Sequence, residues 1–99
     1  MKNKTQAEMM HLSKVASLPC CISGMRPVQI HHLRYGMGMG QRNDNFHVIP
    51  LHYDFHQGRL GIHTMGRKKW QEIYGDEIYL WRKTMTILYG EDESLWPHV

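Results

Sequence analysis

The sequence predicts a small α+β domain in which a short β-hairpin is flanked by helices. Apolar residues recur at helical spacing near both ends of the 99-residue chain, and two short apolar runs typical of strands lie between them. The length fits one compact domain. We therefore expect residues 1–99 to form a single domain that ends in a loose tail from about residue 91.

The first expected element is a helix over residues 6–15. Thr5 and Glu8 have the spacing of a capping box, and Pro19 ends the helical stretch before the cysteines. The chain has eight histidines, and we expect His11 in this helix and His98 near the chain end to lie on the surface.

The expected hairpin comprises an extended segment over residues 27–34 and a second strand over residues 46–51. The stretch between them is rich in glycine and asparagine, which favours a loop. Pro50 lies near the end of the second strand, where a missing N–H group is tolerated. A helical turn is expected over residues 53–57, followed by a loop that begins at Gly58.

The last third of the chain is expected to be helical. One predicted helix covers residues 67–74 and ends at Gly75, and Asp76 is the predicted N-cap of the next helix. This next helix has a broad apolar face made of Ile78, Leu80, Trp81, Met85, Ile87 and Leu88. We expect the side chains of Trp70, Tyr79 and Trp81 to belong to the core rather than to stack on bases.

Composition and charge exclude several classes of protein. A formal net charge of +3 is compatible with a polyanionic partner but does not establish one. The two cysteines, Cys20 and Cys21, are adjacent and cannot build a disulfide scaffold, so we expect a cytoplasmic protein. No apolar run approaches the roughly 20 residues of a membrane-spanning helix. The charged N-terminus is not followed by the hydrophobic segment of a secretory signal.

The histidines point to metal-assisted hydrolysis. Neutral imidazole is a common metal ligand, and its ordinary pKa near 6.5 suits a general base at neutral pH. A phosphodiester resists attack by water unless a cation offsets the growing negative charge and a base removes the proton. His31 and His32 are neighbours, so both can face one site only if their strand ends or bends there.

Residue types alone leave two kinds of metal site open. A catalytic site would use several histidines as ligands and keep another as the base. A structural zinc site would instead hold the metal in a noncatalytic nucleic-acid-binding or adaptor module, with Cys20, Cys21, His52 and His56 as its ligands.

Three runs of residues together resemble a known family. They read Ile-His-His-Leu-Arg at 30–34, Gly-Met-Gly-Met-Gly-Gln-Arg at 36–42 and Ile-Pro-Leu at 49–51. This combination resembles the phage recombination enhancement function family, which comprises HNH-superfamily nucleases described as dependent on the RecA recombinase. The likeness covers about residues 18–80. It implies a ββα-metal fold, DNA endonuclease activity, and a divalent metal ion (Mg²⁺, Mn²⁺ or Zn²⁺) as cofactor.

The resemblance also implies roles for individual residues. His31, His56 and His63 are the implied metal ligands, and His32 is the implied general base. His47 lies where the motif has its central Asn or His, which braces the loop and orients the base by hydrogen bonding. The candidates for phosphate contacts are Arg34, Arg42, Lys68 and Lys69.

The chain departs from the family pattern in a second set of metal ligands. Ser23 replaces a cysteine and Phe55 replaces a histidine, so only Cys20 and His52 remain of a four-ligand zinc set. We therefore expect no tight structural zinc, and we expect Phe55 to fill that space as core. At most four residues precede the first helix, where relatives have a long basic arm, so we expect DNA cleavage with altered or lost dependence on a RecA filament.

Overall fold

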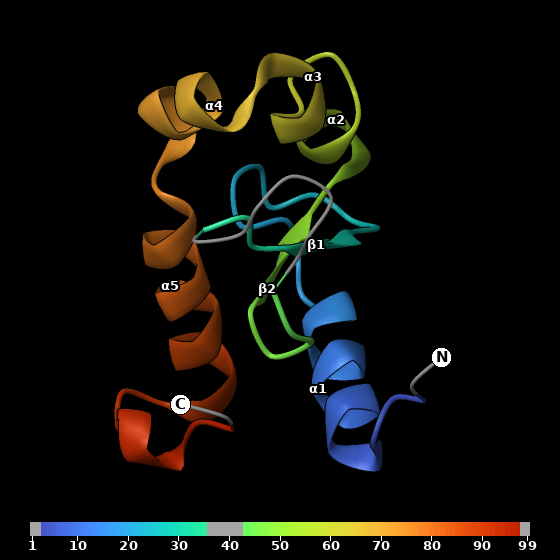
Figure 1. Ribbon diagram of the computed structural model, residues 1–99, viewed down its shortest axis with the longest axis vertical. Coiled ribbons are helices and arrows are strands. Elements are labelled where there is room, and N and C mark those ends of the chain that lie inside the picture. The colour runs from blue at the N-terminus through green and yellow to red at the C-terminus, as the bar shows by residue number, and fades with distance from the viewer. Residues whose placement is uncertain (1–2, 36–42, 98–99) are drawn as a thin grey trace.

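The computed structural model describes residues 3–35 and 43–97. Within these ranges the chain is an α+β structure, as predicted, with one antiparallel hairpin among helices. The elements in order are α1 (Gln6–Ala16), β1 (Gln29–His32), β2 (Val48–Leu51), α2 (Tyr53–His56), α3 (Ile62–Met65), α4 (Arg67–Tyr74), α5 (Glu77–Tyr89) and the 3-10 turn η1 (Glu93–Leu95). The hairpin crosses the middle of the molecule, with α1 towards one end, α2 to α4 at the other, and α5 along one side (Figure 1).

The hairpin sets the positions of the two adjacent histidines. In its register His31 pairs with Ile49 and His32 with Val48, so β1 ends at the second histidine of the pair. All four residues of β2 are buried, because α1 and α5 also pack on this strand. A strand buried on both faces is apolar throughout rather than alternating, and β2 reads Val-Ile-Pro-Leu.

Helix α1 begins where its capping box predicts. Thr5 Oγ1 accepts a hydrogen bond from the backbone N–H of Glu8, and Glu8 Oε1 accepts one from that of Thr5. The expectation that His11 is exposed is wrong, because its side chain is only 2% exposed. His11 lies four residues before the buried Val15 on the same face of the helix, and its Nδ1 is 2.6 Å from Tyr89 Oη of α5.

Helices α4 and α5 supply the aromatic centre of the core. Trp70 and Trp81 are buried as predicted, and each indole N–H donates to a backbone carbonyl, that of Leu60 and that of Phe46 respectively. The prediction that Tyr79 is core is wrong, because 58% of its surface is exposed. Tyr79 lies between the buried positions of α5 and points away from them.

After α5 the described part of the chain packs back on the core, where a loose tail from about residue 91 was expected. After η1, Trp96 is 6% exposed and packs edge-to-face on Trp81, with 5.7 Å between the ring centres. Its indole N–H also donates to the carbonyl of Gly90 at 2.8 Å. Over residues 3–35 and 43–97, no helix combines the length and apolar character needed to cross a membrane.

Candidate metal centre

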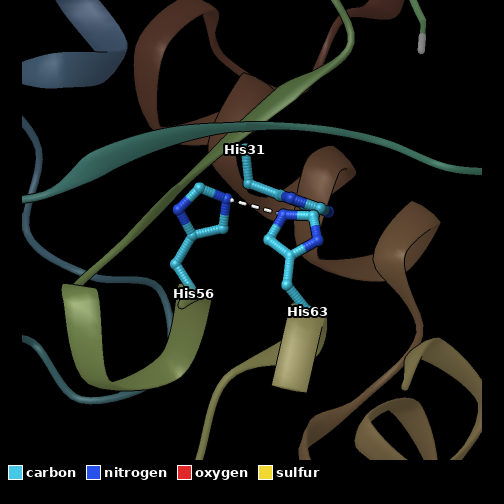
Figure 2. Close-up of side chains that lie close together, drawn as sticks. All are labelled: His31, His56 and His63. Atoms are coloured by element: carbon cyan, nitrogen blue, oxygen red, sulfur yellow. Dashed lines mark hydrogen bonds between the residues drawn. The ribbon is translucent and has the colours of Figure 1, made fainter. Parts of the chain in front are cut away.

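Three histidines from three different elements converge at one point. His31 comes from β1, His56 from the last position of α2 and His63 from α3. One ligating atom from each lies within 4.8 Å of the other two, and Figure 2 shows the three rings turned towards one another. The structure therefore brings together the three residues that the sequence analysis assigned as metal ligands.

Local structure explains how the three elements meet. His52 is the N-cap of α2, where its Nδ1 accepts from the backbone N–H of Asp54 at 3.2 Å, and His56 follows one helical turn later. A Cβ atom on Gly61 would lie 2.5 Å from the carbonyl oxygen of His56. Only glycine therefore allows the chain to pass so close to α2. Gly61 is also the N-cap of α3, so this close approach places His63 beside His56. Helix α3 was not predicted from the sequence, which indicated only a loop after Gly58.

Outer hydrogen bonds hold two of the three rings in fixed orientations. His56 Nδ1 donates to the amide oxygen of Gln29 at 2.8 Å, which leaves Nε2 facing His63 Nε2 at 3.0 Å. His31 Nε2 donates to the carboxylate of Glu77 at 2.7 Å. Such second-layer partners are typical of metal-binding histidines, because they fix the ring and its tautomer.

Glu77 is the residue of this site that the sequence analysis missed. Its side chain is fully buried at the start of α5, although a buried carboxylate is rare without partners. The sequence does indicate that Glu77 is buried. It lies three and four residues before Leu80 and Trp81 and therefore shares the predicted apolar face of the helix. A charge on that face has to meet a partner inside the protein.

The electrostatics of the cluster keep two histidines neutral. Burial, followed by the neighbouring histidines His31 and His63, lowers the pKa of His56 to about 4. Burial also lowers the pKa of His63 from its ordinary value, with further contributions from His31 and Arg34. Neutral imidazole is the form that binds a metal ion, so both side chains are ready to ligate at neutral pH.

His32 lines the same cavity as the three clustered histidines. The cavity has a volume of about 200 Å³, and Ile30 and Arg34 complete its lining. His32 is the last residue of β1, and the end of the strand allows the two adjacent histidines to face one site, as the sequence analysis required.

Asn45 holds the His32 ring. Asn45 Oδ1 lies 2.9 Å from His32 Nε2, and Asn45 Nδ2 donates to Glu8 Oε2 at 2.9 Å. A carboxylate accepts hydrogen bonds only, so the amide nitrogen faces Glu8 and the amide oxygen faces His32. The Nε2 atom of His32 therefore carries the proton, and Nδ1 is its basic nitrogen.

His47 braces the loop before β2, which is one of the two tasks that the family pattern assigns to the central residue of the motif. Its Nδ1 lies 2.8 Å from Asp44 Oδ1, and its ring stacks on Trp81 with 4.7 Å between the centres. The hydrogen bond to His32 comes from Asn45, two residues earlier in the same turn. The family pattern pointed to His47 for this hydrogen bond, and Asn45 carries no signal in the sequence that would have identified it.

The alternative zinc ligands are not gathered. Among residues 3–35 and 43–97, His31, His56 and His63 form the one group of three or more possible ligands at metal-binding distance. The ring of His56 thus belongs to the histidine cluster rather than to a set with Cys20, Cys21 and His52.

The thiols of Cys20 and Cys21 are surrounded by protein rather than by the histidine cluster. Burial raises the pKa of Cys21 to about 12, and Cys20 Sγ accepts hydrogen bonds from the backbone N–H groups of Ile22 and Ser23, each at 3.4 Å. Phe55 packs against the core and meets Tyr74 edge-on at 5.3 Å, as predicted for its position.

The basic candidates lie at different distances from the cluster. Arg34 lines the histidine cavity, whereas Lys68 and Lys69 border a separate hollow on α4. Arg67 is the basic residue of α4 that reaches the site, because its Nε lies 3.1 Å from Glu77 Oε1. Arg42 lies outside the described residues.

Comparison with known proteins shows the family of the chain. A family model described as "Protein of unknown function (DUF968)" matches residues 1–90, and the chain belongs to this family. No curated protein and no solved structure matches the chain.

Proposed function

We propose that this protein is a metal-dependent DNA endonuclease built on a ββα-metal unit. The observation that carries the proposal is the convergence of three histidines in a cavity that a fourth histidine, His32, also lines. The hairpin followed by α2, with ligands on β1 and α2, has the order expected for such a unit. The family resemblance of the sequence supports the same activity.

The arrangement of the histidines fits a metal ion. Two nitrogen ligands bonded at about 2.1 Å to one tetrahedral ion lie about 3.4 Å apart. The Nε2 atoms of His56 and His63 are 3.0 Å apart and share a hydrogen bond, so a metal ion that replaces this proton requires the two atoms to separate by only about 0.4 Å. A set of three imidazoles favours a transition-metal ion such as Zn²⁺ over Mg²⁺, which prefers oxygen ligands.

The chain's own residues divide the work of phosphodiester hydrolysis. His31, His56 and His63 would hold the ion, which supplies positive charge to offset the charge that develops on the phosphate. The Nδ1 atom of His32 accepts the proton of the attacking water, and Asn45 holds this ring in the required tautomer. The guanidinium of Arg34, at the cavity wall, binds a phosphate oxygen of the substrate.

A plasmid-nicking assay tests this function. Supercoiled DNA is incubated with the protein and Zn²⁺, Mn²⁺ or Mg²⁺, with and without RecA-coated single strands, and EDTA is added to matched samples. We expect nicking that EDTA abolishes and that His32→Ala reduces about 10²- to 10⁴-fold, the usual contribution of a general base. His52→Asn is the matched control, because asparagine can still cap α2.

Three outcomes distinguish the alternatives. Nicking only beside RecA-coated strands would add the recombinase filament as a partner. Full activity in His32→Ala would reject the assignment of the base. Tight metal binding without nicking under any condition would reject the nuclease and favour a noncatalytic, metal-stabilised binding module.

A further inference from the structure

The buried carboxylate of Glu77 contacts one metal ligand and no solvent. We propose that Glu77 is a positioning residue that fixes His31 in the tautomer with Nε2 protonated, so that His31 binds metal through Nδ1. This inference rests on the metal centre of the proposed function, but it concerns the way in which the ion is held rather than the reaction.

The hydrogen bonds of Glu77 leave His31 a single arrangement. Glu77 Oε2 lies 2.7 Å from His31 Nε2, and the two side chains are 0% and 1% exposed. Because an ionised carboxylate only accepts, the proton lies on Nε2, and Nδ1 retains the lone pair that a metal ion needs. The pair is sealed from water, so no solvent molecule competes for this hydrogen bond.

Further donors hold the carboxylate in its place. The backbone N–H of Arg34 donates to both of its oxygens, at 3.1 and 3.2 Å, and Arg67 Nε lies 3.1 Å from Oε1. The approach of Arg67 is an ion pair rather than a well-aligned hydrogen bond. Glu77 also occupies the first turn of the 13-residue helix α5, whose N-terminal dipole favours a negative charge. These partners offset the cost of burying the carboxylate.

The two outer partners select opposite ring nitrogens. Gln29 binds Nδ1 of His56 and directs its Nε2 inward, whereas Glu77 binds Nε2 of His31 and leaves its Nδ1. A ligand that binds through Nδ1 places the ion closer to its own backbone than one that binds through Nε2. Glu77 thereby determines how near the ion lies to β1, the strand that also carries His32.

The experiment combines zinc affinity with a tautomer measurement, both without DNA. Nitrogen-15 NMR of histidine-labelled, zinc-loaded protein assigns the ligating nitrogen of each ring, and a chromophoric chelator reports the dissociation constant. In the wild type we expect His31 to ligate through Nδ1 with a proton on Nε2. In Glu77→Gln we expect zinc affinity to fall about 10- to 100-fold, as is usual when a second-layer partner is lost, and a mixture of His31 tautomers.

A matched control separates this role from a general effect of charge. Glu72→Gln removes an exposed carboxylate on the neighbouring helix α4, and it should leave both readouts unchanged. Unchanged zinc affinity and a single tautomer in a folded Glu77→Gln variant would overturn the inference. If that variant does not fold, the wild-type spectrum still decides, because ligation of His31 through Nε2 would overturn it. A protein that shows the expected tautomer yet cuts no DNA would support this inference and reject the nuclease.

Discussion

The adjacent histidines of β1 are each held by a residue that is distant in the sequence. Glu77 of α5 holds His31, and Asn45, in the turn before β2, holds His32. The two rings are therefore held by different partners although they are neighbours in the chain. The resemblance of the sequence to a nuclease family led us to propose different roles for them, whereas their hydrogen-bond partners are visible only in the fold.

The Asn45 contact leads to a prediction about rate. Asn45→Ala removes the acceptor that holds His32 in its tautomer, so we expect DNA nicking to slow roughly ten-fold or more, but less than on removal of the base itself, which is worth about 10²- to 10⁴-fold. Zinc affinity should stay unchanged, because the side chain of Asn45 bonds to His32 and Glu8 rather than to a ligand of the proposed ion. An unaltered nicking rate, measured at saturating metal, would contradict the role of Asn45.

The lowered pKa values of His56 and His63 predict how stability depends on pH. In the unfolded chain these side chains take up protons near pH 6.5, whereas the folded protein keeps His56 neutral down to about pH 4. The unfolded state therefore binds more protons between these values, and the stability of the metal-free protein should fall as the pH drops from about 6.5 to 4. Urea unfolding at pH 7, 6 and 5 measures this fall. His56→Gln should flatten the dependence, and an equally steep one would refute the assignment.

At the scale of elements, capping signals predicted boundaries well. Helix α1 begins after Thr5, α4 covers Arg67–Tyr74 as expected, and Asp76 caps α5 by accepting from the backbone N–H of Ile78. Helix α3 could not be predicted in the same way, because it has four residues and its N-cap, Gly61, offers no side chain. Its existence depends on the close passage of the chain beside α2.

Gly61 therefore links an element to the site. Gly61→Ala places a Cβ against the carbonyl of His56, which should push α3 away from α2 and separate His63 from His56. We expect a loss of both stability and zinc affinity, measured by thermal unfolding and chelator competition. Gly24→Ala is the control, because Gly24 has a φ of +74° but no atom within 4 Å of the added Cβ. That variant should lose about 1 kcal/mol of stability and no zinc affinity. Equal zinc affinity in both variants would contradict this account.

At the scale of the whole molecule, contacts between distant parts of the chain decided what the sequence left open. Local patterns predicted the α+β class, the hairpin and most helices, but they gave no reason to place the side chains of His11 and Trp96 inside. His11 is buried because α1 packs against α5, and Trp96 is buried because η1 returns the chain to Trp81. In Figure 1, α1 and α5 lie on either side of β2, and both helices contact this strand.

The burial of Trp96 after α5 leads to a prediction about global stability. Trp96→Ala removes a buried indole from the core and its hydrogen bond to Gly90, so we expect the free energy of unfolding to fall by about 3 kcal/mol. Leu95→Ala, at the exposed neighbouring position, should change it by less than about 0.5 kcal/mol. Urea denaturation measures both variants. Similar stabilities would show that the tail is not part of the core.

The central claim is that three imidazoles bind one metal ion, and X-ray absorption at the zinc edge tests it most directly. For protein loaded with one equivalent of Zn²⁺, the account predicts a first shell of nitrogen and oxygen at about 2.0–2.1 Å, with the outer-shell scattering of three imidazole rings and no sulfur. A sulfur shell at about 2.3 Å would place the zinc on the cysteines instead. That result, or a failure to retain the metal at all, would contradict the account.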